Sequence, residues 1–454
     1  MKIANNVQEI INSSTISPGS RIYASGNSAS PQILLKQLAM DISITDVELL
    51  GVLLMGDLDE LFSPESCDRI THRVIFNGDQ SRFALNNGQA MYQLMHLSDI
   101  PRQLKKYIQP NIVFLTVSGP DNGGNFSLGT AVEGIPTAIN AAKDLGGLVI
   151  AERNAKMPFV LGTTIKADMI DYLLDVDYEL PVHPSIEFDE QSQKIGRLIA
   201  QHYIHRGTTL QYGIGEVPEA VTNAVLEKGV KDLGIHTELF STAMRKLVEA
   251  GVVNNRYNQR KFCISTVFLA EDQKGYDWLD YNSSIQSRPC DITNSTINIA
   301  KLSNMVAINS AIGVDLHGNI WADSLKANKI YSGIGGQSDF LRGANLSNGG
   351  VPIIAMKSTT ISGVSKILEK SPEGITSTAI AADPIVIVTE QGAFDPRGLS
   401  ICEHAVGIAH LAEENTREEL LKYIYDNEKF HKPRQAIQDR RPKGFVPYQD
   451  SNFN

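Results

Sequence analysis

The chain has 454 residues, of which 42% are apolar and 20% charged, and its formal net charge is −10. This composition predicts a globular protein with two or more domains, and the acidic balance argues against nonspecific binding to nucleic acid or to an anionic membrane. The first residues lack the apolar core of a signal peptide and no apolar run reaches the length of a membrane span, so we expect a cytoplasmic protein without nucleic-acid or membrane partners.

Short apolar runs in the first part of the chain predict strands. They lack strict alternation of apolar and polar residues, as expected for strands buried on both faces of a parallel sheet. Stretches with a helical pattern lie between them, at residues 30–41 and 134–146. This order predicts an open α/β sheet. The predicted strands cover residues 21–26, 47–56, 73–78, 111–119 and 147–154.

The region of residues 177–193 contains prolines and a cluster of acids, and we place a domain boundary in it. The predicted domains are residues 1–185 and residues 186–454. In each of them a strand leads to a glycine-rich loop and a helix, so we expect two open α/β domains of related design. After the boundary we expect helices at residues 191–204, 217–229 and 416–430, and strands at residues 208–215, 261–270, 304–316, 352–359 and 384–390.

A glutamate between two glycine-rich loops is the most informative feature of the chain. Glu238 lies in the segment GIHTELFST, after the loop GIGEVP (213–218) and before the loop SGIGGQSDFLRGA (332–344). Taken singly, a glutamate is usually a solvated surface residue and a glycine cluster is usually a turn. Together they suggest a carboxylate nucleophile that attacks an acyl group while backbone N–H groups hold the oxyanion.

Several common site types lack their signatures. The first loop has a proline where a dinucleotide fingerprint needs its third glycine, and the second lacks the lysine of a phosphate-binding loop. No GxSxG segment is present, and the cysteines and histidines lack metal-ligand spacing, so we expect no metal site. His236 either tunes Glu238 or, as we prefer, fills core space. Asp339 and Arg342 could pair with each other or orient their loop.

Two polar loops in the first half of the chain are further candidates for pocket walls. Residues 25–27 follow the first predicted strand, and residues 117–134 follow a later one. Ligands of open α/β sheets bind beyond the carboxyl ends of the strands, where both loops are expected to lie.

A set of segments in a fixed order resembles the acetyl-CoA hydrolase/transferase family, and within it the 4-hydroxybutyrate-, butyryl- and itaconate-type CoA-transferases. The resemblance covers nearly the whole chain. The segments that carry it are RIYASGNSASPQ, VSGPDNGGNFSLG, LQYGIGEVPEAV, DLGIHTELFS, NMVAINSA, VDLHGNIWADS, YSGIGGQSDFLRGA and VTEQGAFDPRGLS.

The resemblance implies two α/β domains with the active site at their interface. It also implies that Glu238 forms a glutamyl-CoA thioester and that the second glycine loop lies beside this thioester. Two departures from the family pattern bear on acyl preference: Gln391, where many relatives have an aromatic residue, and Lys357, where a smaller residue or proline is common. The predicted contacts of CoA are Gly213, Ile214, Gly215, Glu216, Val217, Gly335, Gly336 and Lys357.

The implied activity is CoA transfer from an acyl-CoA to a small carboxylic acid by a ping-pong mechanism. A carboxylate with a pKa of about 4.3 is ionised at neutral pH and needs no general base. The acids would be of the 4-hydroxybutyrate, butyrate/acetate or itaconate/succinate type, with CoA as substrate, no tightly bound cofactor, and a homodimer or homotetramer as the assembly. The alternatives are an acyl-CoA hydrolase with the same residues and, more remotely, a sugar-phosphate isomerase or regulatory α/β protein.

Overall fold

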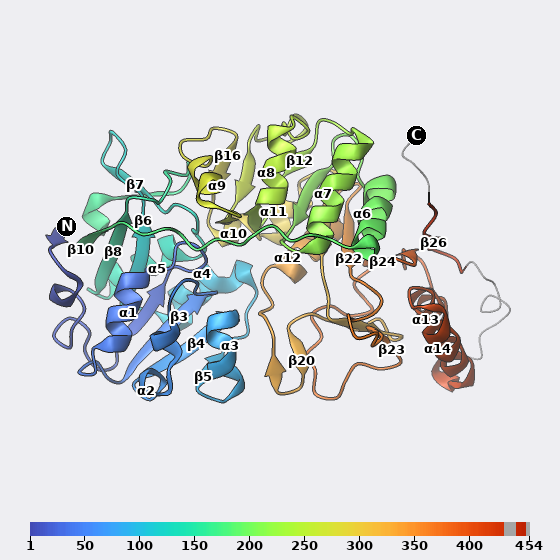
Figure 1. Ribbon diagram of the computed structural model, residues 1–454, viewed down its shortest axis with the longest axis horizontal. Coiled ribbons are helices and arrows are strands. Elements are labelled where there is room, and N and C mark those ends of the chain that lie inside the picture. The colour runs from blue at the N-terminus through green and yellow to red at the C-terminus, as the bar shows by residue number, and fades with distance from the viewer. Residues whose placement is uncertain (431–441, 451–454) are drawn as a thin grey trace.

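Two large sheets, one from each half of the chain, form the framework in the computed structural model, which describes residues 1–430 and 442–450. Figure 1 shows them at opposite ends of an elongated molecule. The mixed α/β fold with parallel sheets confirms the predicted fold class.

The first sheet is parallel throughout, as predicted, because its strands are apolar on both faces. The outer strands β1, β5 and β10 were not predicted. The eight strands, in spatial order, are β1 (Lys2–Ala4), β10 (Tyr172–Val176), β8 (Leu148–Asn154), β6 (Ile112–Val117), β2 (Arg21–Ala24), β3 (Val47–Val52), β4 (Ile70–Phe76) and β5 (Ala90–Tyr92).

Successive residues of these strands enter different cores. Ile22 packs in one core with Leu34 of helix α1 (Gln32–Met40), whereas Tyr23 packs in another with Ile139 of helix α5 (Ile135–Asp144). Because neighbouring side chains of a strand point to opposite faces, an apolar strand requires a cover on both sides. The sheet is therefore a layer between helices.

The second sheet has five parallel strands followed by two antiparallel ones at its edge. One face packs against α6 (Glu190–Tyr203) and α7 (Glu216–Lys228), and the other against α12 (Gln337–Leu346) and α13 (Ile401–His410). The strands, in spatial order, are β12 (Gly234–Ile235), β11 (Thr209–Tyr212), β17 (Met305–Asn309), β22 (Val351–Ala355), β24 (Val386–Thr389), β25 (Gly392–Phe394) and β26 (Phe445–Pro447).

The segment between β10 and α6 runs as an extended thread across the molecule (Figure 1). Its His183 N–H donates to the Ala270 carbonyl at 2.8 Å, which fixes the thread to the second half of the chain. The proposed domain boundary at residues 185/186 lies within this thread, between the two sheets.

Two predicted strands are each broken into two, so these predictions were wrong. Residues 261–270 form β14 (Cys263–Ser265) and β15 (Val267–Leu269), which pair with different partners, β16 (Ile285–Ser287) and β13 (Leu239–Ser241). Residues 304–316 form β17 and then β18 (Gly313–Asp315), which belongs to a small separate sheet. Both breaks lie beside the cavity described below.

The remaining elements complete the layers and the small sheets. The predicted helix at residues 416–430 corresponds to α14 (Glu414–Asp426). Among the described residues, no helix is both long and apolar enough to cross a membrane. The other elements are α2 (Pro64–Cys67), α3 (Asp79–Asn86), α4 (Ile100–Gln103), α8 (Thr242–Glu249), α9 (Gln273–Asp277), α10 (Cys290–Thr293), α11 (Thr296–Ala300), β7 (Asn125–Ser127), β9 (Thr164–Lys166), β19 (Ile320–Trp321), β20 (Ser324–Lys326), β21 (Lys329–Ile330), β23 (Ile367–Leu368), and the short 3-10 or π turns η1 (Val7–Glu9), η2 (Asp59–Phe62), η3 (Leu97–Asp99), η4 (Leu104–Ile108), η5 (Ala167–Met169) and η6 (Glu428–Phe430).

Candidate active site

A cavity of about 420 Å³ lies between the two halves of the chain, and residues of both line it. On the N-terminal side, Asn27 follows β2, Leu53 follows β3 and Phe76 ends β4; on the C-terminal side, Gly213 follows β11 and Asn309 ends β17. These are carboxyl ends of parallel strands, where open α/β sheets bind their ligands. The prediction that residues 25–27 form a pocket wall therefore agrees with the position of Asn27.

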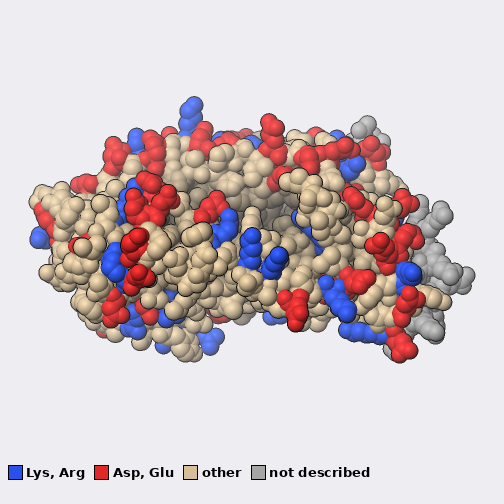
Figure 2. All heavy atoms as spheres, turned by 60° about the horizontal axis from the view of Figure 1, so that its bottom comes forward, with Lys and Arg blue, Asp and Glu red and all other residues tan. Residues whose placement is uncertain are grey.

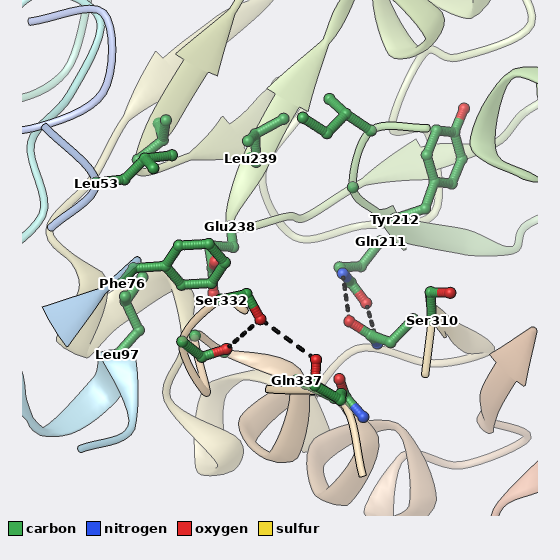
Figure 3. A pocket seen from close by; sticks show the side chains of 18 of the residues that line it. Leu53, Phe76, Leu97, Gln211, Tyr212, Glu238, Leu239, Ser310, Ser332 and Gln337 are labelled. Carbon is green, nitrogen blue, oxygen red and sulfur yellow. Dashed lines mark hydrogen bonds between the residues drawn. The ribbon is translucent and has the colours of Figure 1, made fainter. Parts of the chain in front are cut away.

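Glu238 projects into the middle of this cavity (Figure 3). Its backbone is held firmly: the Glu238 carbonyl accepts hydrogen bonds from the N–H groups of Thr266 and Val267, at 3.1 and 2.9 Å, and from Ser265 Oγ at 2.8 Å. Two consecutive N–H groups can reach one carbonyl only where the strand is interrupted, so the break between β14 and β15 positions Glu238.

The Glu238 carboxylate accepts a hydrogen bond from a buried amide. Asn294 Nδ2 donates to Oε2 at 2.6 Å, and the backbone N–H of Gly336 beside the carboxylate also favours its ionised form. Thr293 Oγ1 donates to Asn294 Oδ1 at 2.7 Å, which occupies the oxygen of the amide and leaves its nitrogen facing Glu238. Asn294 and Thr293 are fully buried, so the donor is fixed before any ligand arrives.

Burial raises the pKa of Glu238 to about 7, and repulsion from Asp339 acts in the same direction. The hydrogen bonds from Asn294 and Gly336 favour the ionised form and offset part of this rise. The expectation of an ordinary, fully ionised carboxylate is therefore wrong for this environment. At neutral pH the ionised and protonated forms of Glu238 are both populated.

Gly336 lies so close to Glu238 that any side chain at this position would displace the carboxylate. A Cβ atom here would lie 1.9 Å from Glu238 Oε2 and 2.0 Å from Asn294 Nδ2. Gly336 directly precedes the first residue of α12, and the positive end of this helix favours an ionised carboxylate beside it. The absence of a side chain therefore allows the close approach of the second glycine loop to Glu238.

The second loop is attached to the N-terminal half of the chain. Leu97 N–H donates to the Gly335 carbonyl at 3.1 Å, and Ser98 Oγ donates to Asp339 Oδ1 at 2.7 Å. Asp339 does not pair with Arg342, whose Nε lies 3.6 Å from Asp383 Oδ1. Of the two roles considered for Asp339, the structure supports orientation of the loop.

Most of the predicted CoA contacts meet at the cavity. Glu238 lines it together with Gly213, Ile214, Val217, Gly335 and Gly336. Gly215 lines a small adjoining cleft instead, and its φ of +121° is one that glycine tolerates.

Glu216 and Lys357 lie outside the cavity lining and pair with each other. Lys357 Nζ also lies 2.7 Å from Asp189 Oδ2, and Ser192 Oγ donates to Glu216 Oε2 at 2.9 Å. A contact of Lys357 with CoA would require Lys357 to exchange the carboxylates of Glu216 and Asp189 for a phosphate of CoA. The predicted CoA contacts of Glu216 and Lys357 stay predictions.

The structure shows residues that the sequence analysis missed. Asn294 was not predicted, because no pattern in a polar stretch identifies one asparagine as the partner of a distant glutamate. Gln211 and Asn309 form a reciprocal amide pair on the cavity wall, with N···O distances of 3.4 and 3.1 Å (Figure 3). Asn309 lies in the segment NMVAINSA, which carried part of the family resemblance.

His236 fills core space, the role preferred in the sequence analysis. It is buried, and its Nε2 lies 2.8 Å from the Thr293 carbonyl oxygen, to which it donates. Burial lowers the pKa of His236 to about 4, so the ring is neutral at pH 7. The neutral ring supports the segment that carries Asn294 and brings no positive charge to Glu238.

A second buried glutamate stands behind the N-terminal wall of the cavity. Glu133 accepts a hydrogen bond from Asn27 Nδ2 at 2.7 Å, and burial raises the pKa of Glu133 to about 8. Glu133 belongs to the loop of residues 117–134, which supplies this support but no lining residue. No group of His, Cys, Asp and Glu suited to a metal ion occurs in the part of the chain that the structure describes.

Comparison with known proteins agrees with this geometry. Residues 2–184 match the family model of the acetyl-CoA hydrolase/transferase N-terminal domain, and residues 272–424 match that of the C-terminal domain. The chain belongs to the acetyl-CoA hydrolase/transferase family. The family resemblance of the sequence segments is thereby confirmed.

Relatives in this family match most of the chain. The 4-hydroxybutyrate coenzyme A transferase of Clostridium kluyveri is 34% identical over 83% of this chain and 86% of its own length. The succinyl-CoA:acetate/propanoyl-CoA:succinate CoA transferase of Fasciola hepatica is 32% identical over 90% of this chain and 85% of its own length. The crystal structure of RipA from Yersinia pestis has a TM-score of 0.85 and 29% identity, covering 95% of this chain and 98% of RipA.

Proposed function

We propose that the protein is a CoA-transferase that moves CoA from an acyl-CoA to a small carboxylic acid, with Glu238 as the nucleophile. The observation that carries this proposal is the carboxylate of Glu238 in the interdomain cavity, held by Asn294 Nδ2 at 2.6 Å and by the N–H of Gly336. The related proteins named as CoA-transferases support the same reaction class.

In the first half-reaction, an oxygen of Glu238 attacks the thioester carbonyl carbon of the acyl-CoA. The C–S bond breaks, CoA leaves as the thiolate, and a mixed anhydride between the acyl group and Glu238 remains. The thiolate then attacks the glutamyl carbonyl carbon and expels the first carboxylate, which carries away one oxygen of Glu238. The product is a glutamyl-CoA thioester.

In the second half-reaction, another carboxylate attacks the glutamyl thioester and the same steps run in reverse. Each attack on the glutamyl carbonyl places negative charge on its oxygen. Asn294 Nδ2 already donates to this carboxyl group and the Gly336 N–H beside it also favours its negative charge, so both are placed to stabilise that charge. Their fixed positions make them an oxyanion hole for the covalent intermediate.

Exclusion of water decides between transfer and hydrolysis. The cavity wall around Glu238 is largely apolar, with Phe76 and Leu97 on the N-terminal side (Figure 3). We therefore favour transfer over hydrolysis by the same residues. A sugar-phosphate isomerase would need cationic side chains for the phosphate, and none line the described part of this cavity.

The experiment that tests this function is the exchange of labelled acetate into acetyl-CoA by the protein without a second acid. A ping-pong enzyme catalyses this exchange because the first half-reaction is reversible on its own. We expect exchange together with parallel lines in double-reciprocal plots. Release of free CoA without incorporation of label would instead identify a hydrolase. The absence of both reactions would contradict the proposal.

We expect the first half-reaction to depend on pH through Glu238. Its pKa is raised to about 7, so below pH 7 the protonated form predominates and the nucleophile is lost. The kcat/KM for acyl-CoA should therefore rise about tenfold per pH unit up to pH 6–7 and level off above this range. The measurement is the rate profile from pH 5 to 9. A profile that is flat from pH 5 to 8 would contradict the raised pKa.

Replacement of Asn294 by alanine should lower kcat/KM about 100-fold, because a fixed donor to the oxyanion is lost. The midpoint of the pH profile should also rise, since this hydrogen bond lowers the pKa of Glu238. A matched control is Asn254→Ala, at an exposed site whose side chain donates to Asp232. Equal activities of the two variants would show that Asn294 takes no part in the mechanism.

Several finer proposals accompany this function. The predicted CoA contacts at Gly213, Ile214 and Val217 fit the C-terminal wall of the cavity. CoA is a substrate in this scheme and no resident cofactor is needed. We further propose a homodimer or homotetramer in the cytoplasm, which size-exclusion chromatography with light scattering and cell fractionation would test.

A further inference from the structure

Apolar side chains line the cavity on both sides of Glu238, and the two sides differ in their polar groups. The C-terminal side has apolar residues such as Leu239 and Ile308, and it also carries the amide pair of Gln211 and Asn309 and the glycine loop at Gly213. The N-terminal half is apolar except for one amide, and its walls are Val52, Leu53, Phe76, Leu97 and Asn27. CoA and the acid must meet at Glu238, so under the proposed function the acid's carbon chain occupies the half that CoA leaves free.

We propose that the apolar N-terminal half is the acyl chamber, and that it selects aliphatic monocarboxylic acids and rejects dicarboxylic acids. This inference rests on the proposed CoA-transferase function and specifies its substrate class. The related proteins do not decide the matter, because one is named for 4-hydroxybutyrate, a monocarboxylate, and another for succinate, a dicarboxylate. The side chains around the chamber of this chain decide it.

The backbone of the acyl chamber wall is constrained by uncommon conformations and hydrogen bonds. Asn27 and Leu53 both have left-handed backbone conformations, with φ of 52° and 39°, and the Asn27 N–H donates to the Leu53 carbonyl at 2.7 Å. The Asn27 side chain is tied to Glu133, which is itself left-handed, with φ of 44°. Non-glycine residues adopt this conformation rarely, and only where the surroundings enforce it. Rearrangement of this wall would therefore not readily bring a positively charged side chain toward a second carboxylate of the substrate.

The acyl chamber offers no cation to a second carboxylate. Among the described lining residues of the whole cavity, Glu238 alone is charged, and none is lysine, arginine or histidine. Two acids lie directly behind the wall: Glu133 contacts Asn27, and Asp339 contacts Ser98 next to Leu97. Neither of them supplies a positive charge to a second carboxylate.

Two basic side chains close to the wall already face carboxylates. Arg82 stacks over the ring of Tyr331, with its guanidinium 4.5 Å from the ring centroid, and its Nη1 lies 2.6 Å from Asp79 Oδ1. His96 lies close enough to Asp339 to lower the pKa of that carboxyl. Neither lines the cavity, so the charge of a dicarboxylic acid would be desolvated without compensation.

Matched acceptor acids test this inference. Acetyl-CoA serves as donor, and the acceptors are butyrate, succinate and monomethyl succinate, of which the last has an uncharged ester in place of the second carboxylate. We expect kcat/KM for butyrate to exceed that for succinate by about 100-fold or more, the scale of an unpaired buried charge. Monomethyl succinate should be accepted far better than succinate, although it is bulkier by one methyl group, because its distal group is uncharged.

A reciprocal variant places a cation in the acyl chamber. Leu53→Arg should shift the succinate-to-butyrate ratio of kcat/KM by at least tenfold toward succinate, whereas Leu53→Met, a neutral change at the same site, should retain the preference for butyrate. Circular dichroism and the Tm show whether each variant is folded. If Leu53→Arg does not fold, the comparison of the three acceptor acids with the wild-type enzyme still tests the inference.

The outcomes separate this inference from the function on which it rests. Transfer to succinate within threefold of butyrate in the wild-type enzyme would overturn the inference and leave the CoA-transferase function intact. An unchanged ratio in folded Leu53→Arg would likewise overturn the placement of the acyl chain. Failure to transfer CoA to any acid, in an enzyme that also fails acetate exchange, would contradict the proposed function itself.

Discussion

Replacement of Glu238 by glutamine should lower the rate of CoA transfer by roughly 10⁴-fold or more, the scale seen when a catalytic nucleophile is removed. Glutamine has nearly the same volume, but its amide is not a nucleophile and cannot form the thioester. Because Glu238 is partly exposed to the cavity and its backbone is held independently of its side chain, the fold should persist. Steady-state rates and the Tm measure the two effects.

A matched control for this variant is Glu249→Gln, at the exposed end of α8, which should retain wild-type activity. The Glu238→Gln protein should also still bind CoA, because the predicted CoA contacts are on other residues. A rate above one hundredth of the wild-type value, after exclusion of contaminating enzyme, would show that Glu238 is not the nucleophile.

Replacement of Gly336 by alanine should reduce activity about 1,000-fold while leaving most of the structure intact. A Cβ atom at this position would lie 1.9 Å from Glu238 Oε2, so the carboxylate must leave its place and lose the hydrogen bond from Asn294. The backbone of Gly336, with φ of −100°, is one that alanine adopts readily, so the damage is local. Activity and thermal unfolding of the purified variant are the measurements.

Gly119→Ala is the control for the glycine substitution. A Cβ atom at Gly119 would meet no atom within 4 Å, and its backbone is also in an ordinary region, so activity should be unchanged. If Gly336→Ala turned over as fast as Gly119→Ala, the second glycine loop would be only a structural turn.

The strands and helices of both sheets were largely predictable because their apolar patterns are strong. The strand predictions were wrong where tertiary contacts outweigh the local sequence pattern. Residues 261–270 have the composition of a single strand, yet the chain breaks at Thr266 because two consecutive N–H groups bind the Glu238 carbonyl. The break at residues 310–312 likewise places Ser310 on the cavity wall. Departures from local preference at functional sites are expected.

The site was predictable only in part, for a similar reason. Glu238 and the glycine loops could be identified as candidates because their residue types, in this order along the chain, have a chemical rationale. Asn294 could not, since its role depends on a contact 56 positions away in the sequence and on the orientation that Thr293 imposes. The raised pKa of Glu238 was also not predictable, because it arises from burial between the two halves of the chain.

The covalent intermediate is the central claim, and mass spectrometry of the protein after incubation with acyl-CoA alone tests it most directly. The account predicts an adduct of CoA less one water on the peptide that contains Glu238, absent from the Glu238→Gln variant. Borohydride should inactivate the enzyme only after acyl-CoA has been added, because it reduces thioesters and not free carboxylates. An enzyme that transfers CoA with sequential kinetics and carries no modification on the Glu238 peptide would contradict the account.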